Sequence, residues 1–482
     1  MRVLMVTPEC YPLIKTGGLA DVTGALPLAL AELGCDARVL LPAYRSIRPK
    51  LTGLRAVANL PNLFGGDAEL LAGEASDGLW VFALDAPHLF DRPGNPYLGP
   101  DGADWPDNHF RFAALAWVGS SIGLGELGDW LPDVVHSHDW QAGLTSAYMA
   151  FGTTSPRPTV LTIHNLAFQG LCPANLLDDL HLPSASFTPD GLEFHGRIGF
   201  LKAGIRYADR LTTVSPTYAR EIRTAEHGMG LDGILRQRAD TLSGILNGID
   251  ESVWDPATDP AIDKPYSARR LQSKAINRQA LQERFGLEPR NDVPLFCVVS
   301  RLTTQKGIDL IIDTLPFLLA KRGQLAVLGA GDAGLEQALS SAAAAHAGQI
   351  GVVIGYDEAL SHRMQAGADA ILVPSRFEPC GLTQLYGLRY GTLPIVARVG
   401  GLADTVVDAN EAALRDGVTT GIQFAPVNAD GLRSALERAF ELFADQATWQ
   451  TMQRRAMGRQ VGWTDPANRY LALYRELATG SA

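Results

Sequence analysis

The sequence predicts an α/β protein with two Rossmann-like domains in tandem that face each other across a deep cleft. Three observations support this prediction. Short apolar runs alternate with longer helical patterns, which is the order typical of a parallel sheet covered by helices on both faces. The alternation occurs twice, and a segment rich in proline and charged residues separates the two series. The chain has 482 residues, which favours more than one domain.

Residues 1–247 form the first series and the first predicted domain. The apolar run 3–6 is typical of a strand buried on both faces. A helical pattern follows from about residue 19 to residue 33, and Gly34 ends it before a second strand at 37–41. Further strands are predicted at 79–84, 133–136, 159–163 and 210–214.

Residues 248–290 are predicted to be a linker, and residues 291–455 a second domain. In the linker, prolines that follow Asp or Lys interrupt regular structure, and one short helix is expected near residues 273–285. Residues 456–482 are expected to form a C-terminal helix that packs back on the first domain. In the second domain we predict strands at 294–300, 324–328, 351–354, 370–373 and 393–396, and helices at 333–347 and 381–390.

The composition argues against several functions. The formal net charge of −11 disfavours nucleic acid and anionic membrane surfaces as partners. No apolar run is long enough to span a membrane, so no membrane association is expected. The five cysteines include no C-x-x-C pair, and the first residues lead into a strand with no secretory signal. A reducing, cytoplasmic location is therefore predicted, while the oligomeric state is not indicated.

Open parallel sheets bind ligands at the carboxyl ends of their strands, so reactive side chains are sought there. The first candidate is the loop that contains Lys15, Gly17 and Gly18, between the first strand and the first helix. The two glycines allow a ligand to approach the backbone, and the helix N-terminus together with Lys15 would attract an anion. A tight turn with a solvated lysine explains the same residues equally well.

The second candidate is the pair Arg301 and Lys306, directly after the first strand of the second domain. Two cations at one strand end can converge on a diphosphate, which Arg301 would bind through its planar guanidinium. Exposed charges at a helix start are the alternative, but cations there oppose the helix dipole unless an anion is bound. The pattern therefore favours a phosphate site.

The third candidate is the segment Glu378-Pro379-Cys380-Gly381, which follows the strand predicted at 370–373. Glu378 and Cys380 would face the cleft, and the helix that begins near Gly381 would direct its N–H groups there. Taken alone, the segment is better explained as a capped turn in which Glu378 only stabilises the start of the helix.

The fourth candidate combines His136, His138 and Asp139 with His164. An H-x-H pattern suggests a metal, but a tryptophan and a glutamine follow where zinc hydrolases place further His and Asp ligands. We therefore predict no metal and no cofactor, and we interpret these side chains as hydrogen-bonding partners of a sugar.

One further motif suggests a different function. The stretch from Gly329 to Gly334 matches G-x-G-x-x-G between a strand and a helix, a pattern typical of dinucleotide-binding domains. It follows the second strand of its domain rather than the first, and Asp357 comes only after the next strand has ended. NAD binding therefore remains an alternative that the motif alone suggests and its position in the domain disfavours.

Together the motifs resemble bacterial glycogen synthases and plant starch synthases over nearly the whole chain. The resemblance rests on the order and spacing of Lys15-Thr16-Gly17-Gly18-Leu19-Ala20-Asp21-Val22, His138-Asp139-Trp140, His164-Asn165, Asn247-Gly248-Ile249-Asp250, Arg301 with Lys306, and Glu378-Pro379-Cys380-Gly381-Leu382. It implies a GT-B fold and a retaining enzyme of glycogen biosynthesis. Such an enzyme transfers glucose from ADP-glucose to the non-reducing end of an α-1,4-glucan, either glycogen or a maltooligosaccharide.

The resemblance also implies roles for individual residues. Arg301 and Lys306 would bind the distal phosphate, Tyr356 would lie by the adenine, and Glu9 would face the acceptor. The residues implied in catalysis are Glu378, Arg301, Lys306, His164 and Asp139. Those implied in donor binding are Lys15, Gly17, Gly18, Asp21, Asn247, Tyr356, Cys380, Gly381, Leu382 and Thr383.

One position departs from the wider group of retaining GT-B enzymes, which carry a second glutamate where this chain has Tyr386. The departure is similar to that of bacterial glycogen synthases, and it leaves ribose binding unassigned. The resemblance implies a reaction on one face of the sugar, in which the leaving diphosphate accepts the proton of the acceptor. A GT-B enzyme acting on a lipid or small molecule and a non-catalytic glucan-binding protein remain alternatives, and the choice between ADP and UDP stays open.

Overall fold

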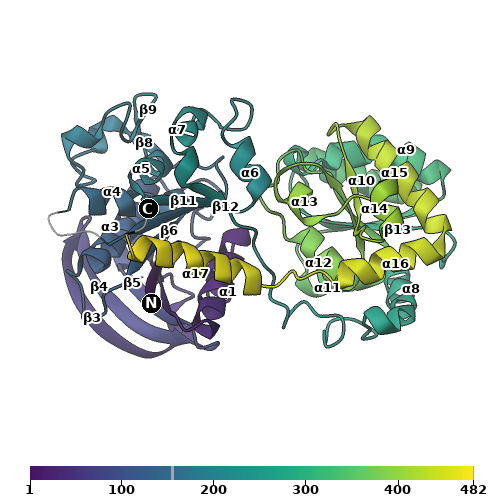
Figure 1. Ribbon diagram of the computed structural model, residues 1–482, viewed down its shortest axis with the longest axis horizontal. Coiled ribbons are helices and arrows are strands. Elements are labelled where there is room, and N and C mark those ends of the chain that lie inside the picture. Colours follow the sequence, from purple (N-terminus) through teal and green to yellow (C-terminus); the bar gives the residue numbers. More distant parts are fainter. Residues whose placement is uncertain (153–156, 481–482) are drawn as a thin grey trace. The chain divides into compact units, whose positions relative to one another are not determined.

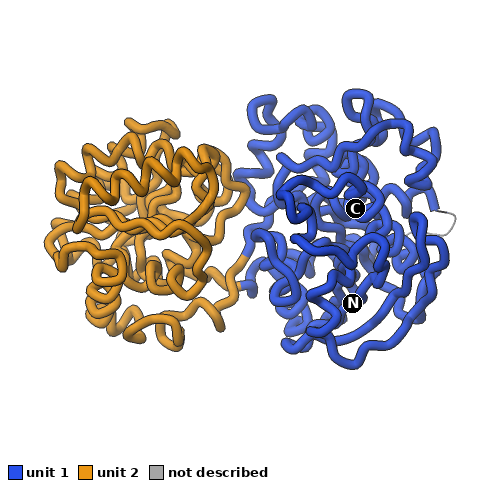
Figure 2. Tube along the Cα trace, turned by 180° about the vertical axis from the view of Figure 1, so that it is seen from behind, with its two compact units in different colours: residues 1–247, 463–482 blue, residues 248–462 orange. Residues whose placement is uncertain are grey.

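The computed structural model describes residues 1–152 and 157–480. The chain divides into two compact units, which Figure 2 shows in different colours. Unit 1 comprises Met1–Asn247 and Trp463–Ala482, and unit 2 comprises Gly248–Gly462. The chain therefore leaves unit 1 after Asn247 and returns to it for the last helix.

Unit 1 is built on a nine-stranded sheet of order β12-β11-β7-β6-β1-β2-β5-β4-β3. The strands from β12 to β5 are parallel to their neighbours, and β4 and β3 are antiparallel. The bounds are β1 Arg2–Val6, β2 Asp36–Pro42, β3 Leu51–Leu63, β4 Gly66–Ala75, β5 Trp80–Asp85, β6 Val134–His138, β7 Thr159–Ile163, β11 Arg210–Thr213 and β12 Leu242–Gly244. A small separate sheet contains β8 Leu171–Pro173, β9 Glu193–Phe194 and β10 Arg197–Gly199.

The sequence predicted the parallel strands of unit 1 except the short β12, and it missed the β3–β4 hairpin. Most side chains of β3 are exposed or half-buried, so the strand lacks the apolar run that marked the others. The first sheet is consequently mixed, not purely parallel as the alternation of strands and helices suggested.

Helices cover the sheet of unit 1 (Figure 1). Their bounds are α1 Gly18–Glu32, α2 Pro87–Phe90, α3 Asn108–Leu124, α4 Leu144–Ala150, α5 Phe200–Tyr207, α6 Pro216–Glu221, α7 Asp232–Gln237 and α17 Thr464–Ala478. The C-terminal helix α17 buries Tyr470, Tyr474 and Leu477, which recur at helical spacing, and packs on α1 and β6.

Unit 2 contains a six-stranded, wholly parallel sheet of order β15-β14-β13-β16-β17-β18. The strands are β13 Leu295–Val299, β14 Gln324–Gly329, β15 Ile350–Ile354, β16 Ala370–Val373, β17 Leu393–Ala397 and β18 Ile422–Phe424. The helices are α8 Lys274–Arg284, α9 Ile308–Ala320, α10 Ala333–Ala345, α11 Glu358–Gly367, α12 Thr383–Tyr390, α13 Gly400–Thr405, α14 Glu411–Arg415, α15 Ala429–Ala444 and α16 Gln446–Met457. Every predicted strand of this unit is present, and the short β18 was missed.

The segment 248–290 packs as part of unit 2, which differs from the expected linker. Trp254 and Tyr266 are buried in the core of this unit. The buried ammonium of Lys274 donates to the Ala366 carbonyl at 2.8 Å and to Thr392 Oγ1 at 2.7 Å. Prolines and charges correctly indicated an irregular backbone, but irregular backbone can still be anchored by a few buried side chains.

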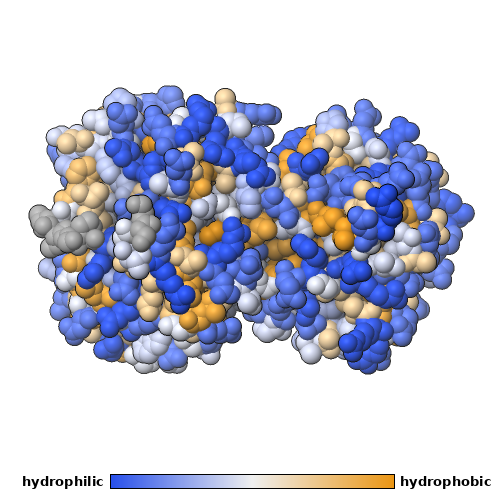
Figure 3. Space-filling view, viewed as in Figure 1, coloured by the Kyte–Doolittle hydropathy of each residue, from blue (hydrophilic) through white to orange (hydrophobic). Residues whose placement is uncertain are grey.

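The surface is mainly polar on the face shown in Figure 3, where hydrophobic residues form smaller patches between hydrophilic ones. Within residues 1–152 and 157–480, no helix has the length and apolar character needed to span a membrane.

Candidate active site

The predicted residues of unit 1 gather at one edge of its sheet. Glu9 follows β1, Asp139 follows β6, His164 follows β7 and Asn247 follows β12. These strands are parallel, so their carboxyl ends meet at the same edge, which is where open sheets bind ligands. Asn247 is nearly buried, and its Oδ1 has no hydrogen-bond partner among the described residues. A buried amide oxygen without a partner is rare and marks a position where a ligand could bind.

Asp139 is held in an unfavourable conformation. Its φ of 56° and ψ of −169° belong to a region that glycine adopts easily and other residues avoid. The carboxylate accepts hydrogen bonds from the backbone N–H groups of His164 at 2.6 Å and Asn165 at 3.2 Å. Burial raises the pKa of Asp139 to about 7, despite these two bonds. Backbone strain and a buried charge together are typical of a functional position.

The histidines form a row instead of a cluster. The ring centroids of His136 and His138 are 4.2 Å apart, and those of His138 and His164 are 5.3 Å apart. Burial lowers the pKa of His136 and His164 to about 3, so both rings are neutral at physiological pH. No group of three or more His, Cys, Asp or Glu side chains within the described ranges is arranged to hold a metal ion.

Glu9 lies in a network that the sequence did not predict. Its side chain is almost fully buried, and it accepts hydrogen bonds from the Thr16 hydroxyl at 2.7 Å and from the Thr16 N–H. The hydroxyl of Tyr97 donates to Glu9 Oε1 as well. Tyr97 is far from Glu9 in sequence and lies in a loop, so no local pattern identified it. The network fixes the Glu9 carboxylate at the sheet edge.

The glycine loop of unit 1 leads into α1 as expected, but Lys15 is not an isolated cation. Lys15 Nζ lies 2.7 Å from Asp21 Oδ1, and both side chains are partly exposed. Gly17 is the N-cap of α1 and Gly18 its first residue, and no side chain caps the helix. The first N–H groups of α1 therefore remain available to a ligand.

In unit 2, Lys306 and Glu378 form one ion pair. Lys306 Nζ donates to Glu378 Oε2 at 2.5 Å, and the Ser375 hydroxyl donates to the same oxygen at 2.8 Å. The sequence placed the two residues at one site but did not predict that they pair. Arg301 is exposed at the end of β13, and no described residue binds its guanidinium. The loop after β13 thus carries one cation without a partner among the described residues and one lysine that is paired with a carboxylate.

A second ion pair joins the loop that carries Glu378 to the start of helix α9, which follows the loop of Lys306. Arg376 binds Asp309 through two hydrogen bonds of 2.7 and 2.6 Å. Its backbone N–H also donates to the Gln305 carbonyl at 2.9 Å. The two loops follow β13 and β16, which are neighbours in the sheet. The contacts of Arg376 therefore help to hold Lys306 and Glu378 close to each other.

Glycines shape the backbone around Glu378. Gly381 has a φ of 73° and Gly400 a φ of 43°, both in the left-handed region. A Cβ on Gly400 would lie 2.0 Å from the Glu378 carbonyl oxygen, which leaves room for glycine alone. The N–H of Gly401 donates to that carbonyl at 3.2 Å. The pair Gly400-Gly401 after β17 was not predicted, although two glycines after a strand were a visible signal.

The remaining predicted residues of unit 2 also follow carboxyl ends of its strands. Cys380 is buried, and Leu382 and Thr383 stand at the start of α12. Tyr356, just after β15, is 82% exposed, so its ring is accessible to a ligand. Tyr386, at the position of the missing second glutamate, stacks on Trp254 with ring centroids 3.7 Å apart. This residue therefore anchors the segment 248–290 through its ring.

The G-x-G-x-x-G stretch does not form an anion site. The Asp332 side chain caps α10 by accepting hydrogen bonds from the N–H groups of Gly334 at 2.9 Å and Leu335 at 3.1 Å. A carboxylate thus occupies the helix N-terminus that a pyrophosphate would need in a dinucleotide-binding domain. This local structure argues against the NAD alternative.

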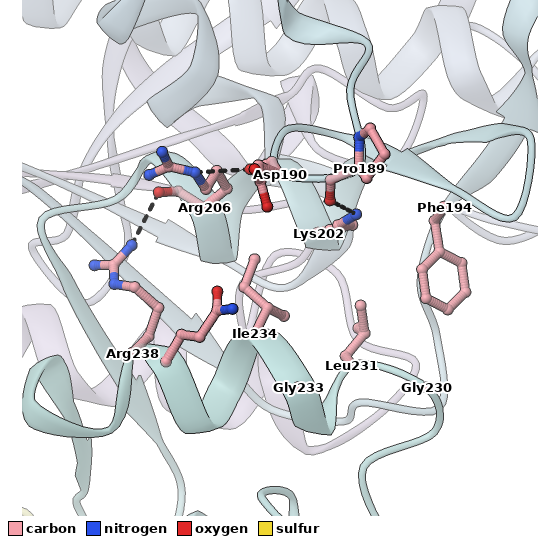
Figure 4. A pocket seen from close by; sticks show the side chains of 11 residues that line it. Pro189, Asp190, Phe194, Lys202, Arg206, Gly230, Leu231, Gly233, Ile234 and Arg238 are labelled. Atoms are coloured by element: carbon pink, nitrogen blue, oxygen red, sulfur yellow. Dashed lines mark hydrogen bonds between the residues drawn. The ribbon is translucent and has the colours of Figure 1, made fainter.

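A cavity of about 490 Å³ lies in unit 1 among α5, α7 and the loop before β9 (Figure 4). Its cations bind backbone carbonyl groups: Lys202 donates to Pro189, Arg206 to Asp190, and Arg238 to Arg206. None of the predicted site residues lines it. The charges of this cavity therefore hold loops together, and the predicted site lies elsewhere in the unit.

Comparisons with known proteins identify relatives over the whole chain. The family model of the starch synthase catalytic domain matches residues 2–237, and that of glycosyl transferases group 1 matches residues 280–455. A glycogen synthase of Roseobacter denitrificans is 57% identical over 480 residues, which is 100% of both chains. A glycogen synthase of Mesorhizobium japonicum is 54% identical over 477 residues, which is 99% of both.

Solved structures agree with these matches. The catalytic domain of starch synthase IV from Arabidopsis thaliana, bound to ADP and acarbose, superposes with a TM-score of 0.89 at 30% identity, covering 99% of each chain. A sucrose-phosphate synthase from Thermosynechococcus elongatus has a TM-score of 0.62 at 17% identity over 99% of each chain, a likeness in fold alone. The GT-B fold predicted from the sequence is confirmed.

Proposed function

The chain belongs to the glycogen and starch synthase family of glycosyltransferases, and on this basis we propose that it transfers glucose from ADP-glucose to the non-reducing end of an α-1,4-glucan. The configuration at the transferred carbon is retained, and glycogen or a maltooligosaccharide is the acceptor. Relatives named glycogen synthase and a structural relative bound to ADP support this choice of substrates. The reaction belongs to glycogen synthesis in the cytoplasm.

The observation that carries the proposal is the pair of cations after β13. Arg301 has no protein partner within the described residues, and Lys306 is held by Glu378 at the same sheet edge. A nucleotide sugar carries a diphosphate, and a guanidinium with an ammonium can neutralise its growing charge as the glycosidic bond breaks. In this role the cations replace the metal ion that other transferases use.

The other site residues bind the sugar and the nucleotide. Glu378 accepts hydrogen bonds from the hydroxyls of the transferred glucose, and its charge favours the positive charge that develops on the anomeric carbon. His164, Asp139 and Asn247 bind the same glucose as hydrogen-bonding partners, and Glu9 serves the acceptor. The donor is further bound by Lys15, Gly17, Gly18, Asp21, Tyr356, Cys380, Gly381, Leu382 and Thr383.

The protein's contribution to the reaction is positioning and charge stabilisation. The leaving diphosphate accepts the proton of the acceptor hydroxyl, and the new bond forms on the face from which the diphosphate departs. No side chain needs to act as a nucleophile on this path. Preorganised donors and fixed geometry supply the rate enhancement.

The proposal is tested by a donor screen. Purified full-length protein is incubated with glycogen and either ADP-glucose or UDP-glucose, and glucose incorporation into the polymer is measured with and without EDTA. We expect ADP-glucose to be at least about tenfold better in kcat/KM, which corresponds to about 1.4 kcal/mol. EDTA should leave the rate unchanged. Failure of both donors would reject the proposal, and a loss in EDTA that magnesium restores would reject the role given to Arg301 and Lys306.

A further inference from the structure

Three histidines lie on a buried face of the unit 1 sheet, where parallel sheets normally carry apolar side chains. His136 and His138 alternate along β6, and the strand register places His138 beside Thr162, two residues before His164. His136 and His138 have no exposed surface, and His164 is 9% exposed. Burial of polar rings costs free energy unless they are hydrogen-bonded, so a row of this kind requires a reason beyond packing.

Each ring in the row is held by at least one hydrogen bond. His138 Nδ1 lies 3.0 Å from His164 Nε2, so one ring donates a hydrogen bond to the other. His136, whose ring is tilted against that of His138, is fixed at both nitrogens: the Tyr474 hydroxyl is 2.7 Å from Nδ1 and Thr162 Oγ1 is 2.6 Å from Nε2. The row therefore runs from helix α17 to the ligand edge of the sheet.

The row leaves His164 with a single nitrogen for a ligand. A neutral imidazole has one N–H and one bare nitrogen, and which nitrogen carries the proton depends on its partners. With Nε2 bound to His138, His164 can offer only Nδ1, which has no partner among the described residues. His138 makes no other hydrogen bond through its ring, since its Nε2 is buried without a partner in the described structure. Among the described residues, the His138 ring thus bonds to His164 alone. A proton on His138 Nε2 would be a buried N–H without an acceptor, so His138 carries its proton on Nδ1 and donates it to His164 Nε2, which leaves the proton of His164 on Nδ1.

We propose that His138 is a positioning residue for glucose transfer, which locks the ring and the tautomer of His164 so that Nδ1 meets the sugar. The inference rests on the proposed function, because that function places His164 beside the transferred glucose. Without the hydrogen bond, His164 could rotate and exchange its proton between the two nitrogens. Only a fraction of the molecules would then present the competent state, and the rate would fall with that fraction.

Two substitutions of His138 separate hydrogen bonding from packing. His138→Phe keeps a ring of similar size and removes the hydrogen bond. His138→Asn loses the ring but keeps a polar group near the position of Nδ1. We expect kcat to fall about ten- to a hundredfold in His138→Phe and to stay within about fivefold of wild type in His138→Asn, with little change in the KM for ADP-glucose. A structural role would produce the opposite order, because Phe preserves the packing.

The tautomer of His164 is measured directly by NMR of protein labelled with ¹⁵N in histidine, and the signal is assigned by its loss in His164→Asn. A single neutral tautomer is expected in wild type and His138→Asn, and a mixture in His138→Phe. A mixture in wild type, or near-normal kcat with a single tautomer in His138→Phe, would overturn the proposal. Should wild type transfer no glucose from either donor, the proposed function fails while the NMR measurement still decides the role of His138. If His138→Phe does not fold, the tautomer seen in wild type still tests the proposal.

Discussion

Two buried carboxylates of unit 1 and two paired carboxylates of unit 2 are stabilised in different ways. In unit 1, Glu9 and Asp139 are buried, and their bonds come from hydroxyls and backbone N–H groups. In unit 2, Glu378 pairs with Lys306, and Asp309 pairs with Arg376. Burial raises the pKa of Asp139 to about 7, whereas the hydrogen bonds from Arg376 lower the pKa of Asp309.

This difference shows how one architecture can serve two kinds of ligand. Both units place polar groups at the carboxyl edge of a parallel sheet. In unit 1 these groups are neutral rings, an amide and two carboxylates, which suit the hydroxyls of a sugar. In unit 2, Lys306 and the uncompensated Arg301 suit a diphosphate. Four substitutions, two affecting mainly catalysis and two affecting mainly stability, test this contrast.

Removing the cation of the Lys306–Glu378 pair in unit 2 should have the largest effect on the rate. In Lys306→Ala we expect kcat to fall by two to three decades, because a lost preorganised charge contact raises the barrier by about 3 kcal/mol. Steady-state kinetics with ADP-glucose and glycogen measure this fall. Lys321→Ala, which removes an exposed lysine of the same unit, is the control and should be normal. If only the affinity for glycogen changes, Lys306 contacts the acceptor and not the donor diphosphate, and the prediction is wrong.

Removing the charge of Glu378 while keeping its shape should have the next largest effect. We expect Glu378→Gln to lower kcat by about two decades with a smaller change in donor KM, since the interaction strengthens in the transition state. Glu411→Gln is the matched control, because Glu411 is an exposed acid in the first turn of α14. If Glu378→Gln melts early yet turns over normally, Glu378 only stabilises its turn.

The contribution of the buried carboxylate of Asp139 to the stability of the fold should change with pH in the opposite direction from that of a paired carboxylate. Because the folded-state pKa of Asp139 is raised to about 7, its ionisation lowers stability progressively from about pH 4 to pH 7. Asp139→Asn keeps an acceptor and tolerates positive φ better than most residues. We expect this variant to melt about 2 °C or more above wild type at pH 8, with the gain vanishing near pH 4, and to have a lower kcat. Thermal melts across that pH range provide the measurement, and an equal gain at every pH would contradict it.

The paired carboxylate of unit 2 should show the smallest effect. The pKa of Asp309 is lowered by Arg376, so the pair stabilises the fold above the unfolded-state pKa and loses that contribution as the pH falls through the folded-state pKa. Because the pair is partly exposed, Asp309→Asn should cost about 1 kcal/mol or less at pH 8 and nothing at strongly acid pH. The same melts measure it. A gain in stability at pH 8, as expected for Asp139→Asn, would remove the contrast between the units.

The sequence predicted most of the architecture because the signals were local. Strands such as β1, β13 and β16 are short apolar runs, and parallel sheets bury such runs on both faces. The hairpin of β3 and β4 was missed because most of β3 faces solvent and its composition carries no apolar pattern. The segment 248–290 was expected to be a linker because proline and charge mark irregular backbone without indicating burial.

The order of residues along the chain was enough to assign each polar side chain to the end of a strand. Parallel strands end at one edge of a sheet. Glu9, Asp139 and His164 were therefore expected at the same edge in unit 1. For the same reason Arg301, Lys306 and Glu378 were expected together in unit 2. How these residues are held became visible in the tertiary structure, through the Lys306–Glu378 pair, the Tyr97 hydroxyl on Glu9 and the row from Tyr474 to His164. Each of these contacts joins residues distant in sequence. Such contacts depend on strand register and helix packing, which no local pattern of residues contains.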